Sequence, residues 1–406
     1  MRSMLTAAIA VVLASLPTFD GSDGRVGEGV PAFQVRPGYR VTLAAKDINR
    51  ARFLETDGEG TIFVSQPNEQ TILALRDEDG DGTYEWRKNF VSEQGNCHSM
   101  DFHDGWLWYT ASEAGYLRKA RDTNGDGEAD EIVDVITAKE GVDADDQPIP
   151  TGGGHAFRGV LVHGDRVLIT VSDPRNMTDE LDSPRKTVYS FDLDGGDRKV
   201  FVTGVRNTEK IAHRVDADGS ETDEVWGADH GSDWFGGPYG DERGNQPITD
   251  LQPADELNHL EEGNFYGHPY VMGNRIPRPE HVERDDFHEL AAKTTPPAWS
   301  YGAHTACNGF DFLGSAQGEM FGEDHTGDLF QAQHGSWNSS VPVGYQVARV
   351  LFDEYTGNPY GEQAIVVTHT GEDRPLARPV DCLSLGDGSI LWSCDQNGAI
   401  YRITAE

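Results

Sequence analysis

The fold is indicated most clearly by the stretch Gly164-Asp165-Arg166-Val167-Leu168-Ile169-Thr170. A Gly-Asp turn leads directly into a β-branched, apolar run, which is the pattern of a hairpin turn followed by a short strand. The same pairing of an Asp-Gly or Gly-Asp turn with a β-rich run occurs at five other places, where the runs begin near residues 61, 106, 224, 329 and 390. The chain therefore repeats one turn-and-strand unit six times.

Most of these units lie about 60 residues apart, which is the length of one four-stranded blade with its loops. A single blade cannot bury both of its faces, but a closed ring of blades can. We therefore predict an all-β fold, a six-bladed β-propeller, with residues 39–44 pairing beside residues 400–403 to close the ring. Two packed β-sandwiches are the alternative, because they also contain evenly spaced short strands.

The step between the fourth and fifth units is longer because it contains residues 232–304. This segment is rich in Gly, Pro, Asp and His and has little alternation of apolar and polar residues. We expect a long loop insertion over one mouth of the propeller channel, since long ordered loops are usually functional. The propeller domain is expected to span residues 31–406.

The 406 residues include 33 Lys+Arg and 69 Asp+Glu, for a formal charge of −36. This charge repels phosphate and anionic lipid, so it argues against a nucleic-acid-binding or membrane-surface protein. A hydrophobic content of 37% is enough to form a core, which argues against disorder. An acid-rich, lysine-poor surface suits a saline medium or an exported protein.

The N-terminus has the layout of a secretory signal, which we place at residues 1–20. One positive charge, Arg2, precedes an apolar run from Leu5 to Leu16 that is too short to span a bilayer. A buried N-terminal helix is the alternative. We expect a secreted or periplasmic protein without membrane insertion.

Four cysteines would remain after export, where disulfides are permitted: Cys97, Cys307, Cys382 and Cys394. Cys382 and Cys394 flank a Gly-Asp-Gly turn symmetrically, so the expected bridge is Cys382–Cys394, with Cys97–Cys307 left by elimination. The alternative is four buried free thiols.

Two turns match the pattern of oxygen-rich calcium loops, with acids or amides at positions 1, 3, 5 and 9 and Gly at position 6. The expected ligands are Asp77, Asp79, Asp81 and Glu85 in the first loop, and Asp122, Asn124, Asp126 and Asp130 in the second. Neither loop has the Glu at position 12 of a full EF-hand. We expect a structural role, with a plain polar hairpin tip as the alternative.

Polar side chains gather where predicted strands begin or end, and such loops converge on one mouth of a propeller. They include His155 after a glycine run, Asp173, the pair Arg206-Asn207, the turn His230-Gly231-Ser232, the run from His334 to Asn338, and Arg374 and Arg378. The arginines indicate an anionic ligand.

These motifs, together with Asp255-Glu256-Leu257-Asn258 and Asn264-Phe265-Tyr266-Gly267-His268-Pro269, resemble the glucose/sorbosone dehydrogenase family. The likeness covers residues 39–402. It implies a six-bladed propeller that oxidises a sugar with pyrroloquinoline quinone (PQQ) and Ca²⁺. The chain departs from the family in having no lysine near His334 and in carrying Thr208-Glu209-Lys210 after Asn207.

The resemblance also implies roles for individual residues. His155 would be the general base and Asp173 its partner, while Arg206 and Asn207 would donate to the quinone oxygens. Further implied cofactor contacts are His98, His230, Trp337, Arg374 and Arg378, and the implied ligands of a central Ca²⁺ are the carbonyls of Gly231 and Ser232.

Two other function classes stay open at this point: a calcium-dependent propeller hydrolase of the lactonase kind, and a non-catalytic carbohydrate- or protein-binding propeller. The sequence has no nucleophile elbow, zinc-protease helix, Walker loop or dinucleotide fingerprint. It also has no haem-attachment motif, so an oxidoreductase would pass electrons to a separate acceptor such as a cytochrome c.

Overall fold

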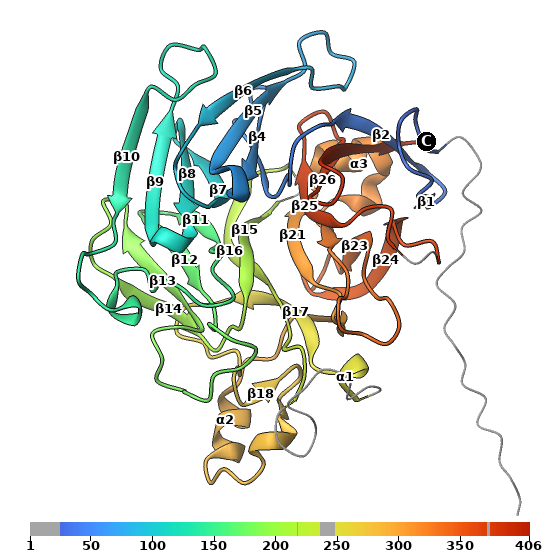
Figure 1. Ribbon diagram of the computed structural model, residues 1–406. Helices are drawn as coiled ribbons and strands as arrows, with labels where there is room; N and C mark the ends of the chain where they lie inside the picture. The colour runs from blue at the N-terminus through green and yellow to red at the C-terminus, as the bar shows by residue number, and fades with distance from the viewer. Residues whose placement is uncertain (1–24, 217, 236–247, 372–373) are drawn as a thin grey trace, which may run out of the picture.

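The computed structural model describes residues 25–216, 218–235, 248–371 and 374–406, and within them six antiparallel sheets, five of four strands and one of five, form a ring (Figure 1). The predicted six-bladed β-propeller is therefore confirmed. In sheet order, the first three blades are β3–β6 (Leu54–Thr56, Thr61–Gln66, Thr71–Arg76, Trp86–Val91), β7–β10 (Cys97–His103, Trp106–Ala111, Tyr116–Arg121, Glu131–Ile136) and β11–β14 (Val160–His163, Arg166–Val171, Thr187–Asp192, Lys199–Thr203).

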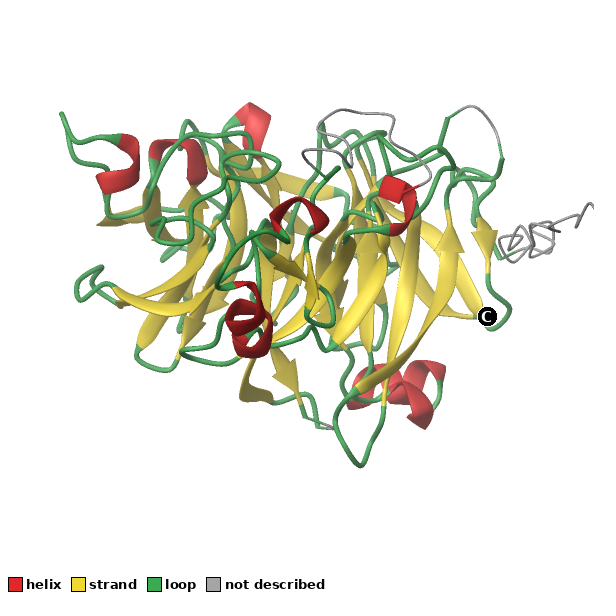
Figure 2. Cartoon of the chain, turned by 90° about the horizontal axis from the view of Figure 1, so that it is seen from below, coloured by secondary structure: helices red, strands yellow, loops and turns green. Residues whose placement is uncertain are grey.

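The remaining three blades are β15, β16, β17 and β20 (Thr208–Val215, Glu221–Asp229, Ala254–Leu260, Trp299–Ala303), β21–β24 (Cys307–Phe312, Leu329–Gln333, Gln346–Phe352, Pro359–Val367) and β25, β26, β27 and β2 (Pro379–Ser384, Ile390–Cys394, Ala399–Ala405, Tyr39–Ala45). The strands β3, β7, β11, β15, β21 and β25 contact one another around the axis, so they are the innermost strands. Figure 2 shows the sheets from the side, with loops and short helices at both ends of the strands.

The N-terminal strand β2 closes the ring by pairing with the C-terminal strand β27. Val41 lies opposite Ile403 and Thr42 opposite Arg402 in an antiparallel register. The preceding short strand, β1 (Gln34–Val35), pairs with the outer strand of the fifth blade. The start of the chain thus joins the fifth and sixth blades, and the predicted closing pair is confirmed.

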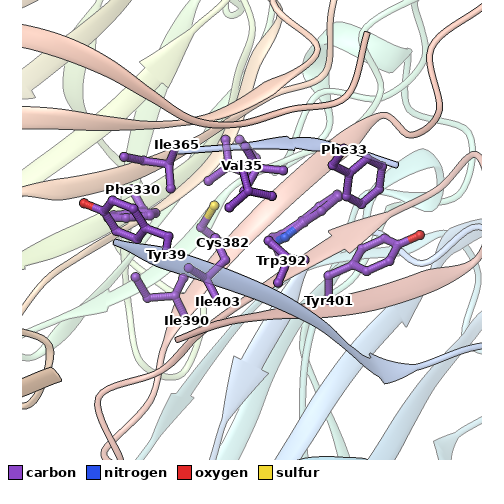
Figure 3. Close-up of a cluster of buried hydrophobic side chains, with 14 of the residues drawn as sticks. Phe33, Val35, Tyr39, Phe330, Ile365, Cys382, Ile390, Trp392, Tyr401 and Ile403 are labelled. Carbon is purple, nitrogen blue, oxygen red and sulfur yellow. The ribbon is translucent and has the colours of Figure 1, made fainter. Parts of the chain in front are cut away.

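The core consists of apolar clusters, one between each pair of neighbouring blades in the described residues. This follows from strands that bury both faces, because each blade is covered by its two neighbours. Figure 3 shows the cluster between the fifth and sixth blades. Trp392 stacks on Tyr401 with 4.4 Å between ring centroids, and Phe33 packs edge-on against Tyr401.

Residues 232–304 are not one continuous loop. Two strands of the fourth blade, β17 and β20, lie within this range and pair with each other. The connections around them carry α1 (Ile248–Leu251), the small hairpin β18–β19 (Val271–Met272, Ile276–Pro277) and α2 (Phe287–Lys293). A third helix, α3 (Ser315–Phe321), lies in the fifth blade.

The predicted disulfides are wrong: all four cysteines are free and buried. Cys97 lies between the first and second blades and Cys307 between the fourth and fifth, so they occupy separate cores. The hairpin of β25 and β26 is centred on Asp387 rather than Gly388, so Cys382 lies opposite Trp392, and a register shift beyond this pair places Cys394 opposite Pro379. The thiols serve as small apolar side chains.

The predicted signal, residues 1–20, lies outside the described residues. Among the described helices, none has the length and apolar character needed to cross a bilayer.

Candidate active site

A cavity of about 360 Å³ opens at one end of the channel. Residues that directly precede or begin the innermost strands line it, including Arg52 before β3, Asn207 before β15, Asn308 in β21 and Arg378 before β25. The cavity therefore lies at the end where these strands start. Seven of the predicted site residues line it: His155, Arg206, Asn207, His230, Gly231, Trp337 and Arg378.

The His155 imidazole is oriented by the main chain of Asp173. Its Nδ1 lies 2.7 Å from the Asp173 carbonyl oxygen, which can only accept, so Nδ1 carries the proton and Nε2 is the basic nitrogen. Burial, followed by the Arg206 charge, lowers the pKa of His155 to about 4. The imidazole is therefore neutral at pH 7. Gly153, at φ +95°, brings this loop within reach of Pro174, where a Cβ would clash.

The Asp173 carboxylate bonds to His268 and Thr178 rather than to His155. Its oxygens accept from His268 Nε2 at 2.8 Å and from the main-chain and side-chain groups of Thr178 at 2.8 and 2.6 Å. Burial alone would raise the pKa of Asp173, but the bonds from His268 and Thr178 hold it below its usual range. Asp173 thus fixes the loop that presents its carbonyl to His155.

Arg206 and Asn207 are positioned by a buried carboxylate at the end of β16. Asp229 accepts from both main-chain N–H groups, at 2.8 and 2.7 Å, and from the Thr208 hydroxyl at 2.8 Å. Gly204 precedes the pair at φ +80°, where a Cβ would lie 2.6 Å from the Phe265 ring. Only glycine fits this close approach of two loops.

The Arg206 guanidinium is buried and bonds mainly to neutral carbonyl groups. It donates to the carbonyl oxygens of Asn176, His230 and Gly231 at 2.8, 3.1 and 2.9 Å, with Asp233 at 3.6 Å. A cation on the Gly231 carbonyl would therefore stand next to this guanidinium. Ser232 lies outside the cavity lining, and its hydroxyl accepts from Arg278 at 2.6 Å.

Arg378 has a similar set of partners. It donates to the carbonyl oxygens of His334 at 3.0 Å and Gly335 at 2.7 Å. His334 bonds to Asp395 at 3.0 Å, which fixes this edge of the cavity. Arg374, by contrast, is exposed and outside the cavity lining.

Arg52 and Glu209 form an ion pair in the cavity wall that no sequence motif indicated. Arg52 donates to Glu209 at 2.7 Å and to Asp395 at 3.3 Å. Burial alone would raise the pKa of Glu209, but the charges of Arg52 and His98 lower it to about 2. His98 is fully buried behind this pair and stacks on Phe157 at 4.0 Å, so it does not line the cavity.

The loops of the fourth and fifth blades are tied together by Asp255. Its carboxylate accepts from Gly231 N at 2.7 Å, and also from the Thr305 hydroxyl at 2.8 Å and Ala306 N at 2.7 Å. Asp255 is only 2% exposed. Buried carboxylates such as Asp229 and Asp255 therefore preorganise the cavity wall.

The sequence model of the TrAA12-like family matches residues 176–406. The chain belongs to the TrAA12-like family. An uncharacterized protein from Borreliella burgdorferi is 29% identical to this TrAA12-like chain over 231 residues, 55% of the chain and 54% of the relative. The chain thus spans about half the length of the curated relative it matches.

Solved structures share the fold of this TrAA12-like chain. The holo form of the pyranose dehydrogenase PQQ domain from Coprinopsis cinerea is 18% identical with a TM-score of 0.74, covering 93% of this chain and 99% of that one. A calcium structure of a Trichoderma reesei family AA12 enzyme has 15% identity and a TM-score of 0.73, covering 92% and 97%. The PQQ-bound aldose sugar dehydrogenase from Streptomyces coelicolor is 14% identical with a TM-score of 0.56, and the match covers 92% of this chain and 100% of that one.

Glu256 is a buried acid behind the cavity of this TrAA12-like chain. Burial and the Asp229 charge raise the pKa of Glu256 to about 8. The folded chain then holds a proton that the unfolded chain loses above about pH 4.5, so stability falls as pH rises from about 4.5 to 8. Glu256→Gln should remove this fall and stabilise the protein by up to about 3 kcal/mol at pH 7.

Urea unfolding at pH 5 and pH 7 measures this effect. The exposed Glu113→Gln variant is the matched control and should follow the wild type at both values. Equal losses of stability between pH 5 and 7 in wild type and Glu256→Gln would contradict the assignment.

Proposed function

We propose that the chain is a PQQ- and calcium-dependent oxidoreductase that oxidises a sugar or a related aldose or alcohol. Electrons would then pass to a separate acceptor such as a cytochrome c. Family membership and the shared fold of PQQ-binding relatives support the class of reaction. The observation that carries the proposal is that Arg206 and Arg378 line the cavity of a strongly acidic protein and donate mainly to neutral carbonyl groups.

The arginines of that wall suit a planar cofactor with three carboxylates. Arg206 and Arg378 donate most of their hydrogen bonds to neutral carbonyl groups, and the carboxylate paired with Arg206, that of Asp233, lies 3.6 Å away. Guanidinium groups bind carboxylates with strong charge-assisted bonds. Arg52 is already paired with Glu209 and Asp395, and it contributes less free charge.

Two further groups could contact a bound ligand. The Oδ1 atom of Asn207 is buried without a hydrogen-bond partner in the described residues, so it can accept from an N–H or hydroxyl group of the ligand. Trp337 lines the cavity and is 52% exposed, with Trp234 packed edge-on at 6.2 Å. A half-exposed indole at a cavity mouth offers a flat surface for a quinone or sugar ring.

Bound PQQ would supply the hydride acceptor, and the chain's own residues supply binding and proton transfer. His155 is neutral and holds its lone pair on Nε2, so it takes the proton of the substrate hydroxyl. The Asp173 carbonyl then holds the resulting imidazolium by accepting from Nδ1–H. Arg206, near His155, favours the return of the neutral imidazole.

The two acidic loops are proposed calcium sites, and the first aspartate of each accepts the same two main-chain hydrogen bonds. Asp77 accepts from the glycine N–H groups at positions 4 and 6 of its loop at 2.8 Å each, and Asp122 does so at 2.7 and 2.6 Å. Carboxylate oxygens of Asp77, Asp79 and Glu85 lie within 4.8 Å of one another. This is the ligand type that Ca²⁺ prefers.

Each loop docks on the blade before it. Tyr84 N donates to Ala44 O in the closing strand β2 at 2.7 Å, and Ala129 N donates to Phe90 O in β6 at 2.9 Å. Both donors stand at position 8 of their loops. An ion in either loop would therefore stabilise a junction between blades, and the first loop would stabilise the ring closure.

We expect Ca²⁺ to raise the melting temperature by several degrees, since one site at 100-fold its Kd contributes about 2.7 kcal/mol. Thermal unfolding in Ca²⁺ and in chelator measures this shift. Asp77→Asn and Asp122→Asn should each remove part of it, whereas Asp165→Asn in an ordinary hairpin turn should not. A full shift in the double variant would contradict the two sites.

Cofactor binding tests the proposed function itself. Calorimetric titration of PQQ into the Ca²⁺-loaded protein should show one site per chain. Absence of binding would contradict the proposal.

A further inference from the structure

A group of histidines lies at the end of the channel opposite the cavity. The innermost strands start at the cavity, and three consecutive ones carry a histidine near their far end: His103 in β7, His163 in β11 and His213 in β15. None of them lines the cavity described above. The second, third and fourth blades thus bring three imidazoles to one place.

Two of these imidazoles are in direct contact. His163 Nδ1 lies 3.0 Å from His213 Nε2, with the ring centroids 5.3 Å apart. The other nitrogen of His213, Nδ1, lies 3.2 Å from a carboxylate oxygen of Glu221. Because that oxygen accepts, His213 carries its proton on Nδ1 and presents the Nε2 lone pair to His163.

The surroundings favour a neutral imidazole next to a bound cation. Burial, followed by the His213 charge, lowers the pKa of His163. Asp223 and Glu262 lie within electrostatic range of His163, and Asp101 within range of His103 and His213. Neutral imidazole nitrogens in an acidic setting are good ligands for divalent transition metals.

We propose that His163 Nδ1 and His213 Nε2 bind a divalent transition-metal ion of the zinc class. Two nitrogens that lie about 2.0–2.1 Å from one ion are separated by about 2.9–3.4 Å at angles from square-planar to tetrahedral. The observed 3.0 Å falls in this range. Water would complete the coordination from the side of His163, which is half-buried, whereas the His213 side chain is 8% exposed.

Glu221 has the position of the carboxylate that orients a ligating histidine. Such a partner fixes the tautomer of the ligand and raises its basicity. Without metal, the 3.0 Å contact is an N–H···N hydrogen bond from His163 Nδ1 to His213 Nε2, and metal binding requires the His163 proton to move to its Nε2. The ion would bridge the third and fourth blades, independently of the proposed redox site.

Zinc titration tests the site. The protein is stripped with chelator and dialysed into excess Ca²⁺ to fill the oxygen-rich loops, and Zn²⁺ is then titrated by calorimetry at pH 7.5. We expect one zinc site whose affinity falls at least about tenfold in His163→Ala and in His213→Ala, and about tenfold in Glu221→Gln. The exposed His288→Ala should bind zinc like the wild type.

Copper provides a readout on the unaltered protein. Electron paramagnetic resonance of the wild type with one equivalent of Cu²⁺ should show coupling to imidazole nitrogens. Absence of zinc binding, a spectrum of oxygen ligands alone, or unchanged zinc affinity in folded His163→Ala would each overturn the proposal. None of these outcomes depends on PQQ binding or turnover, so failure here leaves the proposed function untouched.

Discussion

His155→Ala is expected to lower the turnover of the PQQ-loaded enzyme by about 10²–10⁴-fold while leaving PQQ binding intact. In the proposed function the imidazole is the base, whereas the arginines provide most of the binding. Steady-state dye reduction together with a PQQ titration separates the two effects. His288→Ala, at an exposed position on α2, is the matched control.

The protonation state of His155 adds a pH signature. Because its pKa is lowered to about 4, the base stays neutral down to about pH 5, and activity falls only when the pH approaches 4. An exposed imidazole would already lose activity below about 6.5. Full turnover in His155→Ala, or an activity loss centred near pH 6.5, would remove this residue from the role of base.

Arg378→Ala is expected to weaken PQQ binding by about ten- to a hundredfold. A hydrogen bond to a charged group contributes about 1.5–3 kcal/mol, and Arg378 is one of two cavity arginines bonded mainly to carbonyl groups. Calorimetric titration measures the change in Kd. The loss should shrink when salt screens the exposed part of the site.

The chain offers a matched control for this experiment in Arg374, four residues earlier. Arg374 is exposed and lies outside the cavity lining, so Arg374→Ala should bind PQQ like the wild type. Equal losses in the two variants would mean that general surface charge, rather than the cavity wall, attracts the cofactor.

The blades were predictable because their signals are local. The turn residues and the alternation of apolar and polar side chains that follows them lie within about ten residues. All six predicted runs are the second strands of blades, such as β12 at Arg166–Val171. The pairing of residues 39–44 with 400–403 followed from the need to close a ring. The Cys382–Cys394 prediction failed because the hairpin is centred on Asp387 rather than Gly388, and the spacing of the two cysteines does not reveal a displacement of one residue.

The site was only partly predictable for a related reason. Arg206, Asn207 and His155 stand in recognisable motifs, but Arg52 is a single arginine before a strand and becomes a wall residue only through ring closure. The partner of His155 was expected to be a carboxylate, whereas a main-chain carbonyl takes that place. No side-chain pattern encodes which group of Asp173 faces the imidazole.

The most direct test of the central claim is a reconstitution assay on the purified chain. PQQ and Ca²⁺ are added, and dye reduction is followed with a panel of aldoses and alcohols. We expect sugar-dependent dye reduction that requires PQQ and disappears in His155→Ala. PQQ that binds tightly without supporting the oxidation of any member of the panel, or dye reduction that is independent of PQQ, would contradict the claim.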